Sequence, residues 1–256
     1  MQAVMNVTTE KAQIRLTCLS SAYWRITFDT PLLNAMGLQF LREFREIITA
    51  VETDKRVKVL VFESAVEGFF LNRSDFLKDL TSLTRGPTGL EAWPDILVRI
   101  TRLPAVSIAL IRGFATGNGG GIAQACDMSF ASRENAVLSR WEVGVGLIAG
   151  SGPMARRPGL IGRQRAFEML PNSDDIGGDL AEAYGYVNRS LPDSELDGFV
   201  DALASRIAMF DRWAIANTKC LVNAASLPPD VEIAAAGTPA WPRSFGPPRR
   251  QAESVV

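Results

Sequence analysis

A glycine-rich segment constrains the fold of this chain more than any other feature. Residues 113–121 contain five glycines and separate an apolar run, 106–111, from an apolar stretch, 122–126. This order predicts a buried strand, a turn with few side chains and a helix. Backbone N–H groups at the start of such a helix can hold a phosphate or a developing oxyanion, although a close-packed turn is the alternative. The glycine spacing fits neither a dinucleotide-binding motif nor a P-loop.

Periodic apolar patterns predict an α/β protein. Residues 14–18 and 24–28 alternate around a Ser-Ser turn, which predicts an antiparallel hairpin. Helical spacing over 38–51, followed by the apolar run 57–62, predicts a helix and then a buried strand. Short strands and then several helices are expected further along. The expected strands cover 128–131 and 136–138, and the expected helices cover 163–170, 180–184, 194–210 and 213–225.

The composition excludes several classes of function. Twenty-seven basic and 28 acidic residues give a net charge of -1, so no basic field exists to bind nucleic acid. The chain has no histidine, which leaves proton transfer to carboxylate, Lys, Tyr, Cys or water. Three scattered cysteines and the lack of a long apolar run favour a cytoplasmic protein with no membrane or metal partner.

Seven motifs follow one another along the chain in a recognisable order. They are Pro31-x-x-Asn34-Ala35-Met36, Val57–Val61, Phe70–Phe76, Leu103–Val106, Arg112–Gly119, Ala125–Ala131 and Glu142–Ile148. In order and spacing these motifs resemble the enoyl-CoA hydratase/isomerase family, the crotonase superfamily. The resemblance covers roughly residues 10–230.

The resemblance implies an α/β fold, the crotonase-like ββα spiral, with a helical C-terminal trimerisation region. We therefore expect a spiral core with an acyl-CoA site over 1–190 and a helical oligomerisation region over 191–236. A Pro-rich flexible tail is expected over 237–256. A homotrimer or hexamer is expected, because the large apolar residues of the C-terminal helices need a partner surface.

The resemblance also implies a site for an acyl-CoA thioester, with no separate cofactor. Family members stabilise the thioester enolate with two backbone N–H groups, and ungapped alignment assigns these donors to Asn72 and Asn118. Arg73 replaces a glycine beside the first donor, where it would narrow the pocket or add a cation. The residues expected to contact substrate are Leu71, Arg73, Asp75, Gly117, Gly119, Gly121, Trp141 and Lys219.

The catalytic acids are the largest departure from the family pattern. Hydratases of the family use two glutamates, but the first of these positions is Gly121 and only the second remains, as Glu142. A solvated surface charge is the alternative interpretation of Glu142. Asp75 is expected to cap a helix more readily than to add a second carboxylate. Lys219 aligns with a position where relatives have a cation near CoA, and a solvated surface lysine is the alternative interpretation.

One carboxylate suffices for a proton transfer between two carbons of an enolate. The sequence therefore favours an isomerase-like proton shuttle that uses Glu142. Enoyl-CoA hydratase is the second hypothesis, and a catalytically silent acyl-CoA-binding protein is the third. The acyl chain is not specified, although residues 80–93 are expected to line its pocket.

Overall fold

The computed structural model describes residues 11–73, 83–145, 148 and 152–235. Its strands are β1 Ile14–Cys18, β2 Tyr23–Phe28, β3 Val59–Ser64, β4 Phe69–Leu71, β5 Val106–Ile111, β6 Phe114–Thr116, β7 Met128–Ser132, β8 Val137–Ser139, β9 Ile176–Gly177 and β10 Arg189–Leu191. Its helices are α1 Leu38–Thr53, α2 Ala92–Arg102, α3 Asn118–Ala125, α4 Pro153–Ile161, α5 Arg163–Asn172, α6 Gly178–Tyr184, α7 Asp193–Ala208, α8 Arg212–Ser226 and α9 Asp230–Ala235. A short 3-10 turn covers Val143–Val145.

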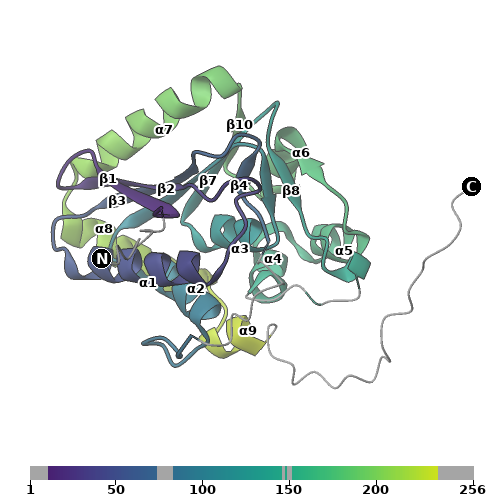
Figure 1. Ribbon diagram of the computed structural model, residues 1–256, viewed down its shortest axis with the longest axis horizontal. Helices are drawn as coiled ribbons and strands as arrows, with labels where there is room; N and C mark the ends of the chain where they lie inside the picture. Colours follow the sequence, from purple (N-terminus) through teal and green to yellow (C-terminus); the bar gives the residue numbers. More distant parts are fainter. Residues whose placement is uncertain (1–10, 74–82, 146–147, 149–151, 236–256) are drawn as a thin grey trace, which may run out of the picture.

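The strands form two sheets (Figure 1). The six-stranded sheet has the order β1-β2-β3-β5-β7-β10, and the four-stranded sheet has the order β4-β6-β8-β9. β1 and β2 pair antiparallel, with Ile14 opposite Phe28, which confirms the predicted hairpin. The other neighbours in the large sheet are parallel, as expected for an α/β protein.

The chain repeats one unit as it winds. A strand of the large sheet leads into a strand of the small sheet and then into a helix, as in β3-β4-α2 and β5-β6-α3. This is the predicted ββα order. Because β4 and β6 are neighbours in the small sheet, successive turns bring the end of β4 next to the start of α3.

Side-chain alternation in β3 divides the core into two layers. Val59 and Val61 face α7, whereas Leu60 and Phe62 face the layer that contains α1, α2 and α3 (Figure 1). A β-strand alternates its side chains in this way, so a run that is apolar throughout is buried on both faces. Each such side chain contributes about 1.5–3 kcal/mol through burial.

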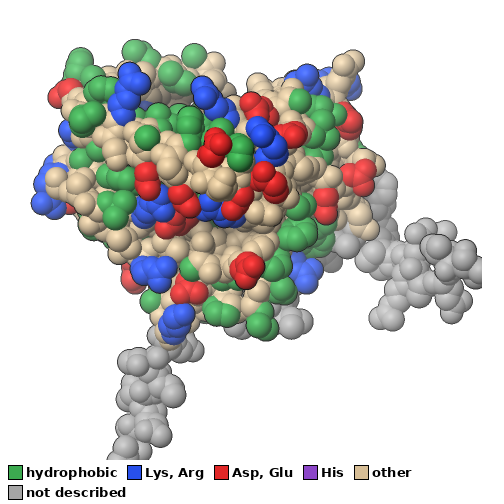
Figure 2. Space-filling model, turned by 90° about the horizontal axis from the view of Figure 1, so that it is seen from above, with side chains coloured by type: hydrophobic (Ala, Val, Ile, Leu, Met, Phe, Trp, Pro, Cys, Tyr) green, Lys and Arg blue, Asp and Glu red, His purple; other side chains and the backbone are tan. Residues whose placement is uncertain are grey.

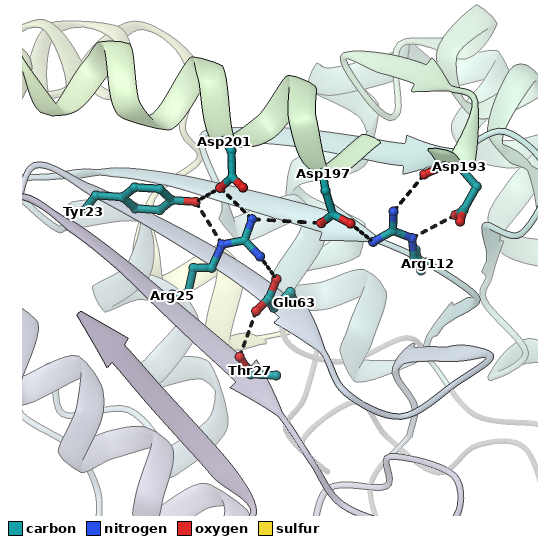
Figure 3. A network of polar contacts seen from close by, with 8 residues as sticks. All are labelled: Tyr23, Arg25, Thr27, Glu63, Arg112, Asp193, Asp197 and Asp201. Atoms are coloured by element: carbon teal, nitrogen blue, oxygen red, sulfur yellow. Dashed lines mark hydrogen bonds and ion pairs between the residues drawn. The ribbon is translucent and has the colours of Figure 1, made fainter. Parts of the chain in front are cut away.

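A polar network fastens α7 to one face of the large sheet (Figure 3). Arg25 donates to Glu63, to the Tyr23 hydroxyl at 3.0 Å and to Asp201 at 2.7 Å. Two further carboxylates of α7, Asp193 and Asp197, each contact Arg112 at 2.9 Å. Acidic and basic side chains accordingly lie close together on the face seen from above (Figure 2).

Three helices, α2, α4 and α9, were not expected from the sequence, and proline obscured the first two. Pro94 lies in the first turn of α2, where the missing N–H costs no helix bond. α4 begins at Pro153 and contains Pro158, a residue that normally argues against a helix. The predicted tail 237–256 lies outside the described residues. No helix in the described part of the chain is long and apolar enough to cross a membrane.

Candidate active site

The glycine-rich segment forms the predicted strand, turn and helix. Gly117 precedes α3 with a φ of 50°, in the left-handed region that favours glycine, and Asn118 is the first residue of the helix. Gly119 packs against the end of β4, because a Cβ there would lie 1.9 Å from the Leu71 carbonyl oxygen. The first turn of α3 therefore fits against β4 only with glycine at this position.

The first predicted oxyanion donor is engaged inside the protein. The Asn72 N–H donates to the carbonyl oxygen of Asn34 at 3.0 Å, and the Asn72 side-chain oxygen accepts from the Thr116 hydroxyl at 2.7 Å. The Arg73 N–H donates to the same side-chain oxygen at 2.8 Å. Contrary to our expectation, Asn72 closes the end of β4 and does not present its N–H to a ligand. Asp75 lies outside the described residues.

Two predicted substrate residues meet beside the glycine turn. The Arg73 guanidinium lies 5.6 Å from the centroid of the Trp141 ring, a cation–π distance. The Trp141 indole nitrogen lies 3.3 Å from where a Cβ on Gly117 would stand. Arg73 and Trp141 thus lie next to the turn that carries Asn118.

Glu142 is buried and paired with an arginine. Only 9% of Glu142 is exposed, and its Oε1 accepts a hydrogen bond from Arg140 Nη1 at 3.2 Å. Glu142 Oε2 is buried with no hydrogen-bond partner. Arg140 is 3% exposed, and its Nε and Nη2 are likewise buried without partners. The interpretation of Glu142 as a solvated surface charge is therefore wrong.

A second buried arginine lies behind this pair. Arg157, 1% exposed, donates to the Tyr186 hydroxyl at 3.2 Å and packs its guanidinium 4.9 Å from the Tyr186 ring centroid. Its Nε and Nη2 also reach the Gln124 side-chain oxygen, at 2.9 and 3.0 Å, in the amide orientation that satisfies both groups. Burial lowers the pKa of Arg157 to about 10, so the side chain stays cationic at neutral pH.

No sequence signal pointed to Arg157, because no helix or strand was expected around it. Tyr186 falls within residues 10–230, which resemble the family, but its residue type alone assigns it no role. Arg140 is a sequence neighbour of Glu142, and that position alone assigns it no role either. Contacts between segments far apart in the sequence create this group, here called the Glu142 cluster: Gln124, Arg140, Glu142, Arg157 and Tyr186.

The Glu142 cluster carries more positive than negative charge. Two guanidinium groups face one carboxylate, and Arg157 Nη1 adds a further buried donor without a partner. Such a surplus is costly in a buried environment and is typical of functional sites. The cluster adjoins α3, since a Cβ on Gly120 would lie 3.2 Å from Arg140 Nη2. Its positive charge and the helix N-terminus would both stabilise negative charge that develops on a bound thioester.

Position 121 faces an apolar surface. A Cβ on Gly121 would lie 3.5 Å from the Trp93 ring and 3.6 Å from Leu97, both on α2. The position that holds a glutamate in the hydratases of the family is therefore occupied by glycine and lies against α2. Trp93, at the end of the segment expected to line the acyl pocket, accordingly lies close to the first turns of α3.

Lys219 has a structural role. Its ammonium donates to the carbonyl oxygens of Ile100 and Ala105, at 3.2 and 2.9 Å, and to Asp127 at 2.7 Å. An ammonium has three donors, so these contacts replace the expected role near CoA. Burial lowers the pKa of Lys219, although the Asp127 carboxylate acts in the opposite direction. In the described ranges, no three Cys, Asp or Glu side chains cluster closely enough to hold a metal ion.

Comparisons with known proteins agree with this architecture. The family model described as enoyl-CoA hydratase/isomerase matches residues 20–237. A crotonyl-CoA hydratase from Syntrophomonas wolfei is 30% identical over 75% of this chain and 74% of its own length. The bovine mitochondrial enoyl-CoA hydratase domain-containing protein 2 is 32% identical over 63% of this chain, which spans 55% of that relative. The structure of a candidate enoyl-CoA hydratase from Streptomyces avermitilis matches with a TM-score of 0.83 and 37% identity, covering 88% of this chain and 82% of that one.

Proposed function

The chain belongs to the enoyl-CoA hydratase/isomerase family, and from that premise we propose that it moves a proton within an enoyl-CoA thioester. In this proposal Glu142 is the single acid–base group and the product is an isomer of the substrate. The observation that supports it most directly is the contrast between a buried Glu142 and a Gly121 that faces Trp93. One carboxylate is enough for such a transfer, whereas hydration must also activate a water molecule.

The proposed reaction uses the two oxygens of Glu142 differently. Arg140 holds Oε1, which fixes the carboxylate, and Oε2 takes a proton from the α carbon of a 3-enoyl thioester. The electron pair moves onto the thioester oxygen and leaves a dienolate. The protonated Glu142 then returns the proton to the γ carbon, giving the 2-enoyl thioester and restoring the carboxylate.

The proposal assigns the developing oxyanion to the first turn of α3. The backbone N–H of Asn118 is one donor, and the positive charge of the Glu142 cluster adds to it. Because Asn72 donates to Asn34, the second donor of the family pattern is not assigned here.

Two other functions have support of their own. Relatives named crotonyl-CoA hydratase and short-chain-enoyl-CoA hydratase favour hydration. The arginine–tryptophan pair over the glycine turn favours a protein that binds acyl-CoA without turning it over, because Arg73 replaces a glycine of the family pattern and lies against Trp141.

One assay distinguishes the three functions. Isomerisation of a 3-enoyl-CoA creates a conjugated thioester and raises ultraviolet absorbance, whereas hydration of a 2-enoyl-CoA lowers it. We expect the rise with 3-enoyl substrates and little change with 2-enoyl substrates. Fast hydration would favour the second function, and calorimetric binding of CoA thioesters with no turnover would favour the third.

The oligomer and the location are also proposals. Met209, Trp213 and Leu221 are 76%, 74% and 73% exposed, which supports a trimer or hexamer that covers them. Light scattering that gives the mass of one chain at micromolar concentration would contradict this. A cytoplasmic location is proposed from the sequence, with the mitochondrial names of some relatives as the alternative.

A further inference from the structure

A cavity of about 640 Å³ lies at the end of α3 that is remote from Asn118. Gln124 and Ala125 at the end of α3, and Met128 at the start of β7, contribute to its wall. A helix rises 1.5 Å per residue, so roughly 10 Å separate this end of α3 from its first turn. The volume lies within the range of 300–1,000 Å³ that is usual for small-molecule sites.

The wall of this cavity is mostly apolar and comes from several elements. α4 contributes Leu160, the end of α7 contributes Ile207, and α8 contributes Ile215 and Val222. Pockets for small ligands combine such a lining with a few placed polar groups. The chemistry of the polar groups therefore indicates which ligand the cavity fits.

Arg156 supplies the polar group that has no partner. It is 6% exposed, lines the cavity, and has a buried Nε and Nη2 without hydrogen-bond partners. Lys219 and Asp127 in the same wall already pair with each other, and the nearby Asp230 pairs with Arg102 at 2.5 Å. Burial lowers the pKa of Arg156 to about 10, which leaves it cationic at neutral pH. Among the described residues of the cavity wall, Arg156 is therefore a positive charge without a matching carboxylate.

The unmatched charge of Arg156 specifies the chemistry of the missing group. A guanidinium forms charge-assisted hydrogen bonds with carboxylates, and an anionic head in this cavity would balance its charge. We propose that the cavity binds a carboxylate with an apolar chain, its head on Arg156 and its chain along α4 and α8. The proposal does not depend on the reaction at Glu142.

A second copy of the chain is the competing occupant. At 3.6 residues per turn, Trp213 and Leu221 lie on one side of α8, while Ile215, Lys219 and Val222 of the cavity wall lie on the other. A subunit that covers the exposed Trp213 face therefore need not fill the cavity. An unmatched buried cation also favours an anionic ligand over an apolar protein surface.

Calorimetry with the full chain tests the proposal, with decanoate as the probe. We expect decanoate to bind with one molecule per chain, while acetate, which lacks the chain, and 1-decanol, which lacks the charge, bind much more weakly. Arg156→Met keeps the apolar stem and should weaken decanoate binding about tenfold to a hundredfold, the range for a charged hydrogen bond. Arg163→Met, at an exposed site on α5, is the control and should change nothing.

Ile215→Trp gives a second variant that narrows the cavity without altering Arg156. It should weaken decanoate binding, and circular dichroism checks that both variants fold. Equal binding of decanoate and decanol, or no binding of decanoate, overturns the proposal. If the parent does not bind decanoate and Ile215→Trp has a smaller mass than the parent by light scattering, the cavity is assigned to a second copy of the chain instead. Decanoate binding that Glu142→Gln abolishes would place the ligand in the catalytic site and also overturn the proposal.

Discussion

Two arginine clusters in this molecule have opposite charge balances. In the α7 network, Arg25 and Arg112 meet four carboxylates, from Glu63, Asp193, Asp197 and Asp201 (Figure 3). In the Glu142 cluster, two arginines meet one carboxylate and keep three buried nitrogens without partners. The first cluster is partly open to water, whereas Arg140 and Arg157 are at most 3% exposed.

The difference separates a structural role from a functional one. The arginines of the α7 network fasten α7 to the sheet at little cost, because every one of the four carboxylates contacts an arginine and water remains close. Buried donors without acceptors lower stability, so the chain retains them at a cost that folding alone does not explain. The comparison therefore predicts that changes in the Glu142 cluster alter turnover and changes in the α7 network alter stability.

Glu142→Gln should have the largest effect. The amide keeps the shape of the carboxylate but cannot accept the proton, so we expect turnover of 3-enoyl-CoA to fall about 10²- to 10⁴-fold. Thioester binding, measured by calorimetry, and the urea midpoint should stay near those of the parent. Glu63→Gln in the α7 network is the matched control and should keep its turnover. Unchanged turnover for Glu142→Gln would refute the single-carboxylate mechanism.

Asn118→Pro should have the next largest effect. Proline is favoured at the first position of a helix, but it removes the N–H that the proposed reaction requires. Loss of one oxyanion donor costs about 2.7–4 kcal/mol in the transition state. Asn118→Ala keeps the N–H and should be mild. If kinetics show alanine to be as damaging as proline while the fold is intact, the side chain and not the backbone is responsible.

Arg25→Met sharpens the comparison from the structural side. The change removes the donor to Glu63, Asp201 and the Tyr23 hydroxyl, and Glu63 is only 17% exposed. We expect the free energy of unfolding to fall by about 1–3 kcal/mol. Turnover per folded molecule should not change. Urea denaturation measures the free energy of unfolding, and the enoyl-CoA assay measures turnover. Lost turnover in a folded variant would mean that the α7 network is part of the catalytic site.

The fold could be predicted from periodic patterns and from the family motifs. The hairpin, α1 and the strand–turn–helix of the glycine segment were read correctly, because each depends on neighbours in the sequence. α2 and α4 were missed, since proline in a first turn or within a short helix resembles a break. Tertiary packing, which a local pattern does not contain, decides such cases.

The candidate site depends on contacts that the sequence does not contain. The catalytic role of Glu142 stays a prediction, and the assignments of Asn72 and Lys219 depended on acceptors elsewhere in the chain. The Asn34 carbonyl oxygen engages the first, and the carbonyl oxygens of Ile100 and Ala105 together with Asp127 engage the second. The positive charge around Glu142 was not predicted either, because Arg157 and Tyr186 are distant from Glu142 in the sequence and only the tertiary structure brings them close.

Asp193→Asn should have the smallest effect, a change in the pH dependence of stability at acidic pH. Burial acts to raise the pKa of Asp193, but hydrogen bonds from Ser132, Arg112 and Asn135 outweigh it and lower the pKa below the ordinary value of 3.8. A carboxyl with a lower pKa in the folded chain stabilises the fold above its ordinary pKa, and this contribution disappears as the pH falls through the lowered value.

The stability of the parent should therefore decline as the pH falls below about 4, and Asp193→Asn should decline less steeply over the same interval. Arg112→Met removes one of the three side-chain donors, so its decline should be intermediate. Urea midpoints at several pH values between neutral and acid measure these slopes. Parallel curves for the parent and Asp193→Asn would mean that the carboxylates of the α7 network do not stabilise the fold through their charge. The contrast with the Glu142 cluster would then rest on burial alone.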